Sequence, residues 1–286
     1  MKRTIVVVIA ALAAASLACS LVPSLNVPRL KTGPTQTLEV DVPRPDTDGP
    51  VDVSLVMGAG TLALTGGADQ LVAGAIQYNV AEWKPTVTSD GTDVKIEQAS
   101  PDTPAGLPEG NDVVNEWDQA LGDVPMNLSL RAGAYQGTLD LSGVPLRSLE
   151  INDGASSVEL KFDSVNPQEM DQLTYHTGAS QVKLSGLANA NFAEMMFESG
   201  AGQYTLDFSG ELQRDAEVSI RSGLSSVDII VPAGMSVEIA VGGGVTNVNT
   251  DGSWTVHGDT YSQSGSGPTL TIGVDMGLGT LRLVSQ

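Results

Sequence analysis

A glycine-centred repeat is the feature that most limits what this chain can fold into. Aligned on one glycine per repeat, the same local pattern recurs along most of the sequence. From Gly133 to Gly242 the successive intervals are 21, 24, 22, 23 and 19 residues. Repeats of this length are typical of solenoids, in which each unit buries its apolar side only by stacking on its neighbours. The aligned glycines are Gly58, Gly133, Gly154, Gly178, Gly200, Gly223, Gly242 and Gly277.

Alternating apolar residues flank each of these glycines. Leu128 and Leu130 precede Gly133, for example, and Leu139 and Leu141 follow it. A period of two places one side of a strand in the core, and a small Gly-Ala-Ser segment allows a positive φ or a sharp corner. We therefore predict an all-β fold, a repetitive β-solenoid or rack of stacked short strands with an N-terminal β unit, and about seven to eight rungs of ~22 residues. Parallel rungs are the simplest arrangement, and an antiparallel sandwich stays open as the alternative.

The N-terminus predicts export and lipid attachment. Lys2 and Arg3 precede an apolar run over 4–17, which is too short to span a membrane and is typical of a signal peptide. Residues 16–19 resemble a lipobox, although Ser16 stands where Leu is usual. We predict a lipoprotein signal peptide over 1–18 and lipid attachment at Cys19, the only cysteine in the chain. An ordinary secretory peptide with an incidental cysteine is the alternative.

Proline, glycine and charge divide the remaining chain. We expect the acidic, proline-rich loop to separate two β units, and the domains to follow in this order: a Pro-containing tether over 19–36, an N-terminal β unit over 37–98, the loop over 99–126, and the repetitive β-rack over 127–286. A second irregular segment at 251–268 carries Trp254, His257 and Tyr261. Long loops with aromatic residues can bind ligands, but we expect these aromatic residues to cap the end of the stack.

Several motifs resemble those of a known family. They are Gly58-Ala59-Gly60-Thr61-Leu62-Ala63-Leu64, Trp83-Lys84-Pro85, Gly154-Ala155-Ser156, Gly178-Ala179-Ser180 and Gly200-Ala201-Gly202-Gln203-Tyr204. With these motifs, residues from about 50 to 286 resemble the bacterial toast-rack family of envelope and secreted proteins, which is distantly similar to β-solenoid adhesins and to sensor domains of envelope stress regulators. The resemblance implies a rack of β-rungs and brings no catalytic residues to this chain.

Catalytic and cofactor chemistry is not predicted. The two histidines, His176 and His257, belong to no recognisable catalytic or metal-binding motif, and we expect the side chain of His176 to face solvent opposite an inward Tyr175. The acids near Gly49 lack the later ligands of a calcium loop. In the repeat alignment, acids alternate with Lys, Ser and Thr in outward columns, as on a solvated face. We predict no enzyme, no cofactor and no metal site.

Composition and location narrow the possible functions. The chain has 14 Lys and Arg against 34 Asp and Glu, a net charge of −20, which disfavours nucleic acid and anionic lipid headgroups as partners. We expect a lipid-anchored, extracytoplasmic protein of the cell envelope that acts as a non-enzymatic surface binding or adhesion module for a glycan or protein. The alternatives are a regulatory partner in envelope stress sensing and a carbohydrate-active β-helix enzyme. The oligomeric state is left open.

Overall fold

The computed structural model describes most of the chain and all of the repeat region. The described residues are 30–47, 49–99, 108–109 and 112–286. The predicted signal peptide over 1–18 and the lipid-attachment residue Cys19 lie outside them, and so does the predicted tether up to residue 29. Residues 30–36, which the sequence assigned to the tether, already belong to the first strand, β1 (Leu30–Val42).

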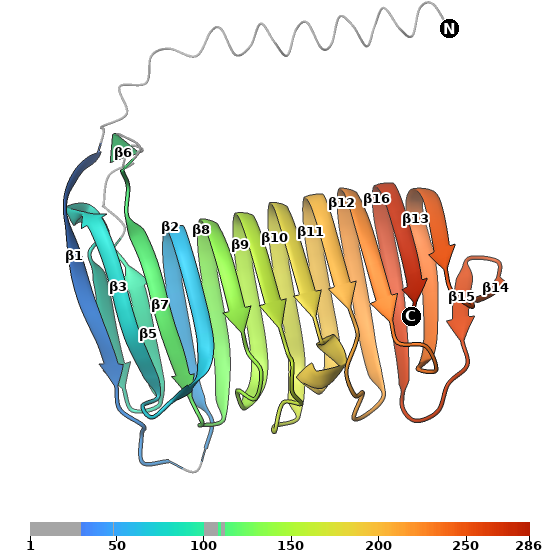
Figure 1. Ribbon diagram of the computed structural model, residues 1–286, viewed down its shortest axis with the longest axis horizontal. Helices are drawn as coiled ribbons and strands as arrows, with labels where there is room; N and C mark the ends of the chain where they lie inside the picture. Colours follow the sequence, from blue (N-terminus) through green and yellow to red (C-terminus); the bar gives the residue numbers. More distant parts are fainter. Residues whose placement is uncertain (1–29, 48, 100–107, 110–111) are drawn as a thin grey trace, which may run out of the picture.

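Eight long parallel strands form the rack. Each rises on one side of the molecule, turns at the top and descends on the other side (Figure 1). In spatial order they are β2 (Val51–Ala68), β8 (Met126–Asp140), β9 (Leu146–Lys161), β10 (Met170–Ser185), β11 (Phe192–Asp207), β12 (Ala216–Val231), β16 (Thr269–Ser285) and β13 (Ser236–Asp251). The parallel, in-register pairing confirms the predicted rack, and the strands continue through the corner where short separate strands were expected. We call the halves before and after the corner glycine the first and second layers.

The order of the last rungs departs from the order of the sequence. β16 pairs with β12 on one side and with β13 on the other, so the C-terminal strand is inserted between two strands that precede it. In the alignment of repeats we placed Gly242 at the corner of the rung that β13 forms. The register instead sets Gly242 beside Asp275, and Gly244 approaches the backbone of the corner residue Gly277.

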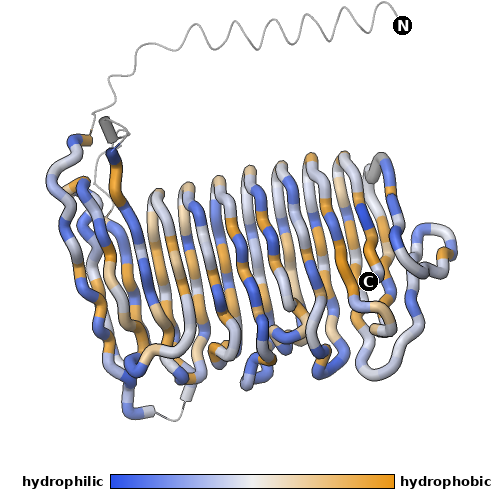
Figure 2. Tube along the Cα trace, in the orientation of Figure 1, coloured by the Kyte–Doolittle hydropathy of each residue, from blue (hydrophilic) through white to orange (hydrophobic). Residues whose placement is uncertain are grey.

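The core lies between the two layers. Apolar and polar residues alternate along each rung, as the colours in Figure 2 show, and the inward positions are nearly all buried. Leu128, Leu130 and Leu139 of β8 are each no more than 2% exposed. Because neighbouring rungs place the same kind of residue at the same register position, the apolar positions join into one continuous cluster.

The corner glycines pack directly on one another. A Cβ atom at Gly178 would lie 2.3 Å from the carbonyl oxygen of Gly154, and one at Gly200 would lie 2.6 Å from that of Gly178. Among the described residues, these corner glycines do not have positive φ. The reason for glycine at the corner is therefore the close approach of successive backbones, and not the positive φ that we considered from the sequence.

Additional strands cover the outer side of the first rung. In the first layer β5 (Asp93–Gln98) pairs with the first half of β2, and β4 (Pro85–Asp90) pairs with β5. In the second layer β7 (Asn115–Gly122), β3 (Val72–Val80) and β1 follow β2 in that order. A two-residue strand, β6 (Pro108–Glu109), pairs with the start of β1. These strands form the N-terminal end of the rack.

The predicted loop over 99–126 contains a strand that the sequence analysis missed. β7 occupies its second half, and Trp117 of β7 is only 2% exposed. The acids of this segment alternate with inward residues, so the strand keeps Glu116 and Asp118 on the solvent side. Because proline and acidic residues surround this strand, its alternation of buried and exposed residues was interpreted as an irregular loop. The division of the chain into domains stays a prediction.

The C-terminal end is partly covered by a small hairpin. β14 (Thr255–His257) and β15 (Thr260–Gln263) form it, and β15 pairs antiparallel with the first half of β13. Trp254 and Tyr261 are partly buried against the core. Their packing agrees with the capping role that we expected for these aromatic residues.

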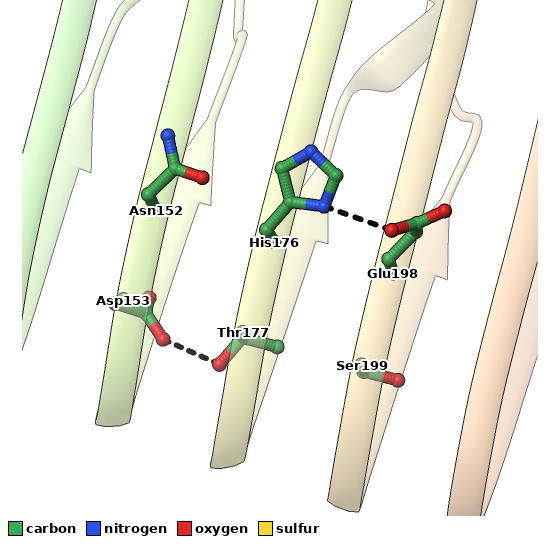
Figure 3. A pocket seen from close by; sticks show the side chains of 6 residues that line it. All are labelled: Asn152, Asp153, His176, Thr177, Glu198 and Ser199. Atoms are coloured by element: carbon green, nitrogen blue, oxygen red, sulfur yellow. Dashed lines mark hydrogen bonds and ion pairs between the residues drawn. The ribbon is translucent and has the colours of Figure 1, made fainter.

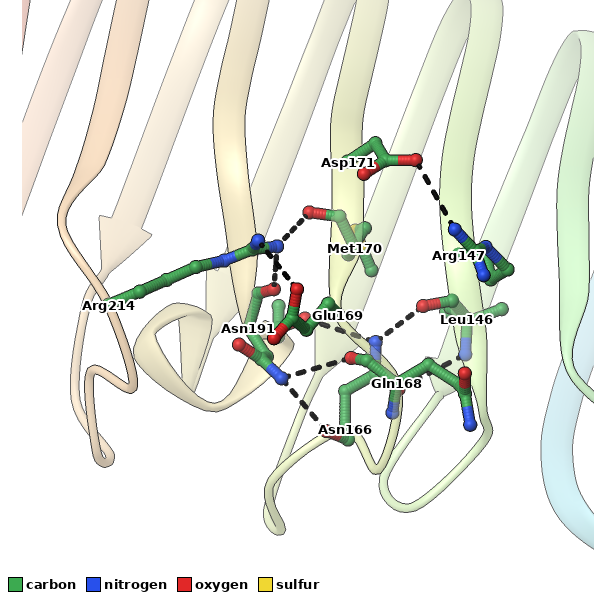
Figure 4. Close-up of polar contacts among 10 residues, drawn as sticks. Leu146, Arg147, Asn166, Gln168, Glu169, Met170, Asp171, Asn191 and Arg214 are labelled. Atoms are coloured by element: carbon green, nitrogen blue, oxygen red, sulfur yellow. Dashed lines mark hydrogen bonds and ion pairs between the residues drawn. The ribbon is translucent and has the colours of Figure 1, made fainter.

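Buried polar side chains fasten the turns that join successive rungs. Asn166 is 1% exposed; its amide oxygen accepts from the N–H of Leu146 at 3.1 Å, and its amide nitrogen donates to the carbonyl oxygens of Leu146 and Ala190. Arg214 reaches across from a later turn and donates to the carbonyl oxygen of Asn191 at 2.8 Å (Figure 4). These bonds satisfy backbone groups that the turns would otherwise leave unpaired.

Helical structure is minor in the described part of the chain. It consists of two short 3-10 helices, η1 (Ala81–Trp83) and η2 (Leu187–Ala190). Gly186 and Asn191 flank η2 in the left-handed conformation, which glycine and asparagine adopt most readily. Neither helix has the length or hydropathy that crossing a membrane requires.

Candidate functional site

Polar side chains gather where the rungs bend. Two adjoining depressions of about 410 and 400 Å³ lie along the corner and share Glu198 and Ser199. We call their lining the corner strip, which consists of Asn152, Asp153, His176, Thr177, Glu198, Ser199, Arg221, Ser222, Asp275 and Gly277. The strip crosses β9, β10, β11, β12 and β16. Figure 3 shows the six residues of its first depression.

The repeat itself places these side chains beside one another. One column of the strip stands two positions before the corner glycine, where Asn152, His176 and Glu198 are paired in register. The neighbouring column stands one position before the glycine and contains Asp153 and Thr177. Since parallel rungs are about 4.8 Å apart, each residue lies within reach of its counterpart on the next rung. The corner glycine thus aligns both columns.

A chain of ionic contacts runs along the outer column. Glu198 lies between two basic groups, with one carboxylate oxygen 3.1 Å from Nδ1 of His176 and the other 3.0 Å from the guanidinium of Arg221. The side chains of His176 and Glu198 are 38% and 36% exposed, so water screens the pair, and its contribution to stability is small. The contacts orient the side chains, and the guanidinium of Arg221 partly neutralises the charge of Glu198.

Behind the strip, a hydroxyl network anchors Asp153. Tyr175 donates to one carboxylate oxygen of Asp153 at 2.9 Å, and Thr177 donates to the other. Ser180 contacts Thr177 at 2.5 Å and Ser156 at 2.9 Å. Burial, together with the negative charge of Asp153, strongly raises the pKa of the Tyr175 hydroxyl. The network therefore keeps Tyr175 protonated and holds Asp153 in a fixed orientation.

The strip offers hydrogen-bond donors and acceptors to an external ligand. Its amide, imidazole, carboxylate, guanidinium and hydroxyl groups alternate from rung to rung. The hydroxyl of Ser199 is bonded to that of Ser222 at 2.7 Å, and not to His176 or a carboxylate. Among the described residues, no three His, Cys, Asp or Glu side chains are arranged to hold a metal ion. The arrangement is suited to binding an elongated polar ligand.

The outward columns that we compared from sequence are in the predicted register. Glu159 pairs with Lys183, and Lys183 pairs with Thr205. In the next column Lys161 lies 3.0 Å from Asp140. These acids have basic or hydroxyl neighbours in the second layer, as expected for a solvated face.

The three tryptophans and the second histidine do not converge on one surface. Trp117 is buried in β7, Trp83 belongs to η1 near the N-terminal end, and Trp254 packs at the opposite end. His257 is exposed on β14. The side chain of His176 is partly exposed as we expected, and it belongs to the corner strip, which the sequence analysis did not identify. The polar residues just before each aligned glycine would have revealed the strip, but only the outward columns after the glycine were compared.

These features define a β-solenoid of parallel, glycine-cornered rungs that displays polar side chains along one bend. The family whose model matches is the N-terminal domain of toast_rack, DUF2154, over residues 31–184. That match covers more than half of the sequence, and the chain belongs to the toast-rack family. The family resemblance that the motifs indicated is thereby confirmed.

Solved structures of bacterial proteins resemble the chain at low identity. A "putative cell adhesion protein" from Clostridium sporogenes is 20% identical, with 88% of this chain and 99% of that chain covered and a TM-score of 0.46. A "putative adhesin" from Bacteroides fragilis and a "putative lipid binding protein" from Parabacteroides distasonis are each 12% identical, with 89% and 99% covered and TM-scores of 0.43. Among curated proteins, none matches this sequence.

Proposed function

We propose that this chain is a non-catalytic binding module of the bacterial cell envelope that holds its ligand along the corner strip. The single observation that carries the proposal is the alignment of Asn152, His176 and Glu198 on three successive rungs, beside the fixed carboxylate of Asp153. A row of polar groups with a regular spacing matches a ligand that itself has repeating polar groups. Lipid attachment at Cys19 and an extracytoplasmic location are part of the same proposal.

A glycan is the ligand class that the chemistry of the strip favours. Sugar hydroxyls both donate and accept hydrogen bonds, and the strip presents both kinds of partner on β9, β10 and β11. Its central carboxylate, Glu198, is already paired with the guanidinium of Arg221 and in contact with His176, so a strongly charged ligand would have to break these contacts. The net charge of −20 further disfavours acidic polymers.

The binding test uses residues 20–286, which contain every described strand. Purified protein is incubated with envelope polysaccharide and with whole cells, and the bound fraction is measured. The combined change Asn152→Ala, His176→Ala and Glu198→Ala should reduce binding at least about tenfold, because each lost hydrogen bond to a ligand weakens it by about 1 kcal/mol. Unchanged binding by this variant would remove the corner strip as the binding site.

A matched control uses exposed residues on the same three rungs. Ser157, Gln181 and Gln203 share one register column just past the corner on β9, β10 and β11. Replacing all three with alanine should leave binding at the wild-type level. Equal loss in both variants would show that the ligand does not distinguish the strip from the adjacent face.

The anchor is tested separately in cells. Wild-type protein should fractionate with membranes and incorporate a labelled fatty acid, whereas Cys19→Ser should do neither. A wild-type protein that carries no lipid would contradict the proposed anchoring, and it would leave the binding result unaffected.

A further inference from the structure

The two ends of the rack have free strand edges in the same layer. At the C-terminal end β15 covers only Val237–Ala240 of β13. The second half of β13 pairs with β16 on one side, and no described strand pairs with its other side. At the N-terminal end β1 pairs with β3 from Gln36 to Val42, and no described strand covers its other side there. Free edges such as these can pair with another chain.

The two edges run in the same direction. β1 is antiparallel to β3, β3 is antiparallel to β7, and β7 is parallel to β2 and therefore to all eight rungs. β1 thus has the direction that a ninth rung following β13 would have. A second copy could place its β1 beside β13 and continue the parallel second layer without reversal.

One core column ends at both edges on an incompletely buried apolar residue. Register pairing traces this column from Leu38 on β1 to Val248 on β13. Its members are Leu38, Ile76, Trp117, Leu62, Gly137, Val158, Val182, Tyr204, Val227, Leu281 and Val248. The nine internal members are buried, whereas Leu38 and Val248 are only partly buried. Joining two copies edge to edge would bury both.

The edges carry acids, and the pairing of β13 with β16 shifts register between Gly243 and Asn247, but basic residues and prolines are absent from both stretches. Neither 36–42 nor 247–251 contains Lys, Arg or Pro, which natural edge strands use against association. If the columns continue across the junction, Asn249 lies beside Glu39 of the second copy, where an amide can donate to a carboxylate. Asp251 would face Asp41, so we expect salt to strengthen the contact by screening this repulsion.

We propose that copies of this chain associate head to tail, with the second half of β13 in one copy pairing in parallel with β1 of the next. Such a contact joins two different surfaces, so it does not close into a symmetric dimer. It would extend the rack and repeat the corner strip along a fibre. This inference does not depend on what the strip binds.

The test measures the sedimentation of residues 20–286 over about a hundredfold range of protein concentration. Wild-type protein should form species that grow with concentration and with added salt. Val248→Asp should block the C-terminal edge and Leu38→Asp the N-terminal edge, so each variant alone should remain monomeric. Circular dichroism and thermal melting establish that both variants are folded.

Mixing the two variants gives the decisive result. The Val248→Asp copy keeps its N-terminal edge and the Leu38→Asp copy keeps its C-terminal edge, so an equal mixture should form dimers and nothing larger. Leu224→Asp serves as a control, because Leu224 is 60% exposed at the corner of β12 and away from both edges; this variant should assemble like wild type. A monomeric wild type at every concentration, or a monomeric mixture beside an assembling wild type, would overturn the proposal.

Discussion

At the scale of single residues, the corner is defined by the missing side chain of glycine. Each inner corner glycine packs against the carbonyl oxygen of the corner glycine on the preceding rung, so closely that a Cβ atom does not fit between them. The same close stacking brings polar side chains of neighbouring rungs into register beside the corner. The residue that shapes the fold therefore also builds the candidate site.

Gly178→Ala should lower the free energy of unfolding by about 1–3 kcal/mol, because the added methyl group would lie 2.3 Å from the backbone of Gly154. The matched control is Gly273→Ala on the exposed side of β16, where the nearest atom to an added Cβ is 3.9 Å away. Denaturant unfolding measures both variants. Equal stability of the two would mean that the corner is looser than described.

The buried tyrosines make stability sensitive to alkaline pH. Burial raises the pKa of both Tyr135 and Tyr175 above the ordinary value of 10.0. The unfolded state then releases protons that the folded state retains, so stability should be constant below about pH 10 and fall as pH rises above it. Tyr135→Phe removes one of these groups and should make the fall less steep. Unfolding free energies measured from pH 8 to higher pH, with identical slopes in both proteins, would disprove this cause.

At the scale of elements, the first rung has to replace the neighbour that it lacks. Every inner corner rests on the preceding rung, but Gly58 of β2 has no rung before it. The side chain of Gln98 on β5 takes that place, accepting from the N–H of Gly58 at 2.9 Å and from Asn115 at 2.8 Å. An end strand thus satisfies a backbone group that stacking would otherwise satisfy.

Gln98→Ala should therefore cost about 1–3 kcal/mol of stability, because the part-buried N–H of Gly58 and the buried amide of Asn115 lose their shared acceptor. Gln181→Ala, on the exposed side of β10, provides the control and should change stability by less than about 0.5 kcal/mol. Thermal melting of the two variants separates a specific capping role from a general effect of removing glutamine. Similar melting temperatures would argue against capping.

At the scale of the whole molecule, the sequence predicted which residues of each rung face the core, but it did not predict the order of the rungs. The alternation around Gly133 or Gly178 is local, so it reveals which residues face inward and how rungs align. Strand order depends on long-range contacts, and any rung with the same alternation can pair with the free edge of β12. That ambiguity is why the insertion of β16 was not predicted. The corner strip was missed because its residues, such as His176 and Glu198, share a register position but not a chemical type.

The arrangement of the last three rungs tests the central claim, an in-register parallel rack with β16 between β12 and β13. Ser226, Thr280 and Asn247 occupy one register column on these strands, and residues 20–286 contain no native cysteine. Ser226→Cys with Thr280→Cys should form a disulfide, since adjacent rungs are about 4.8 Å apart. Ser226→Cys with Asn247→Cys should not, because β16 separates the two strands. The reverse result, with the second pair linked and the first pair free, would contradict the fold and the corner strip that it builds.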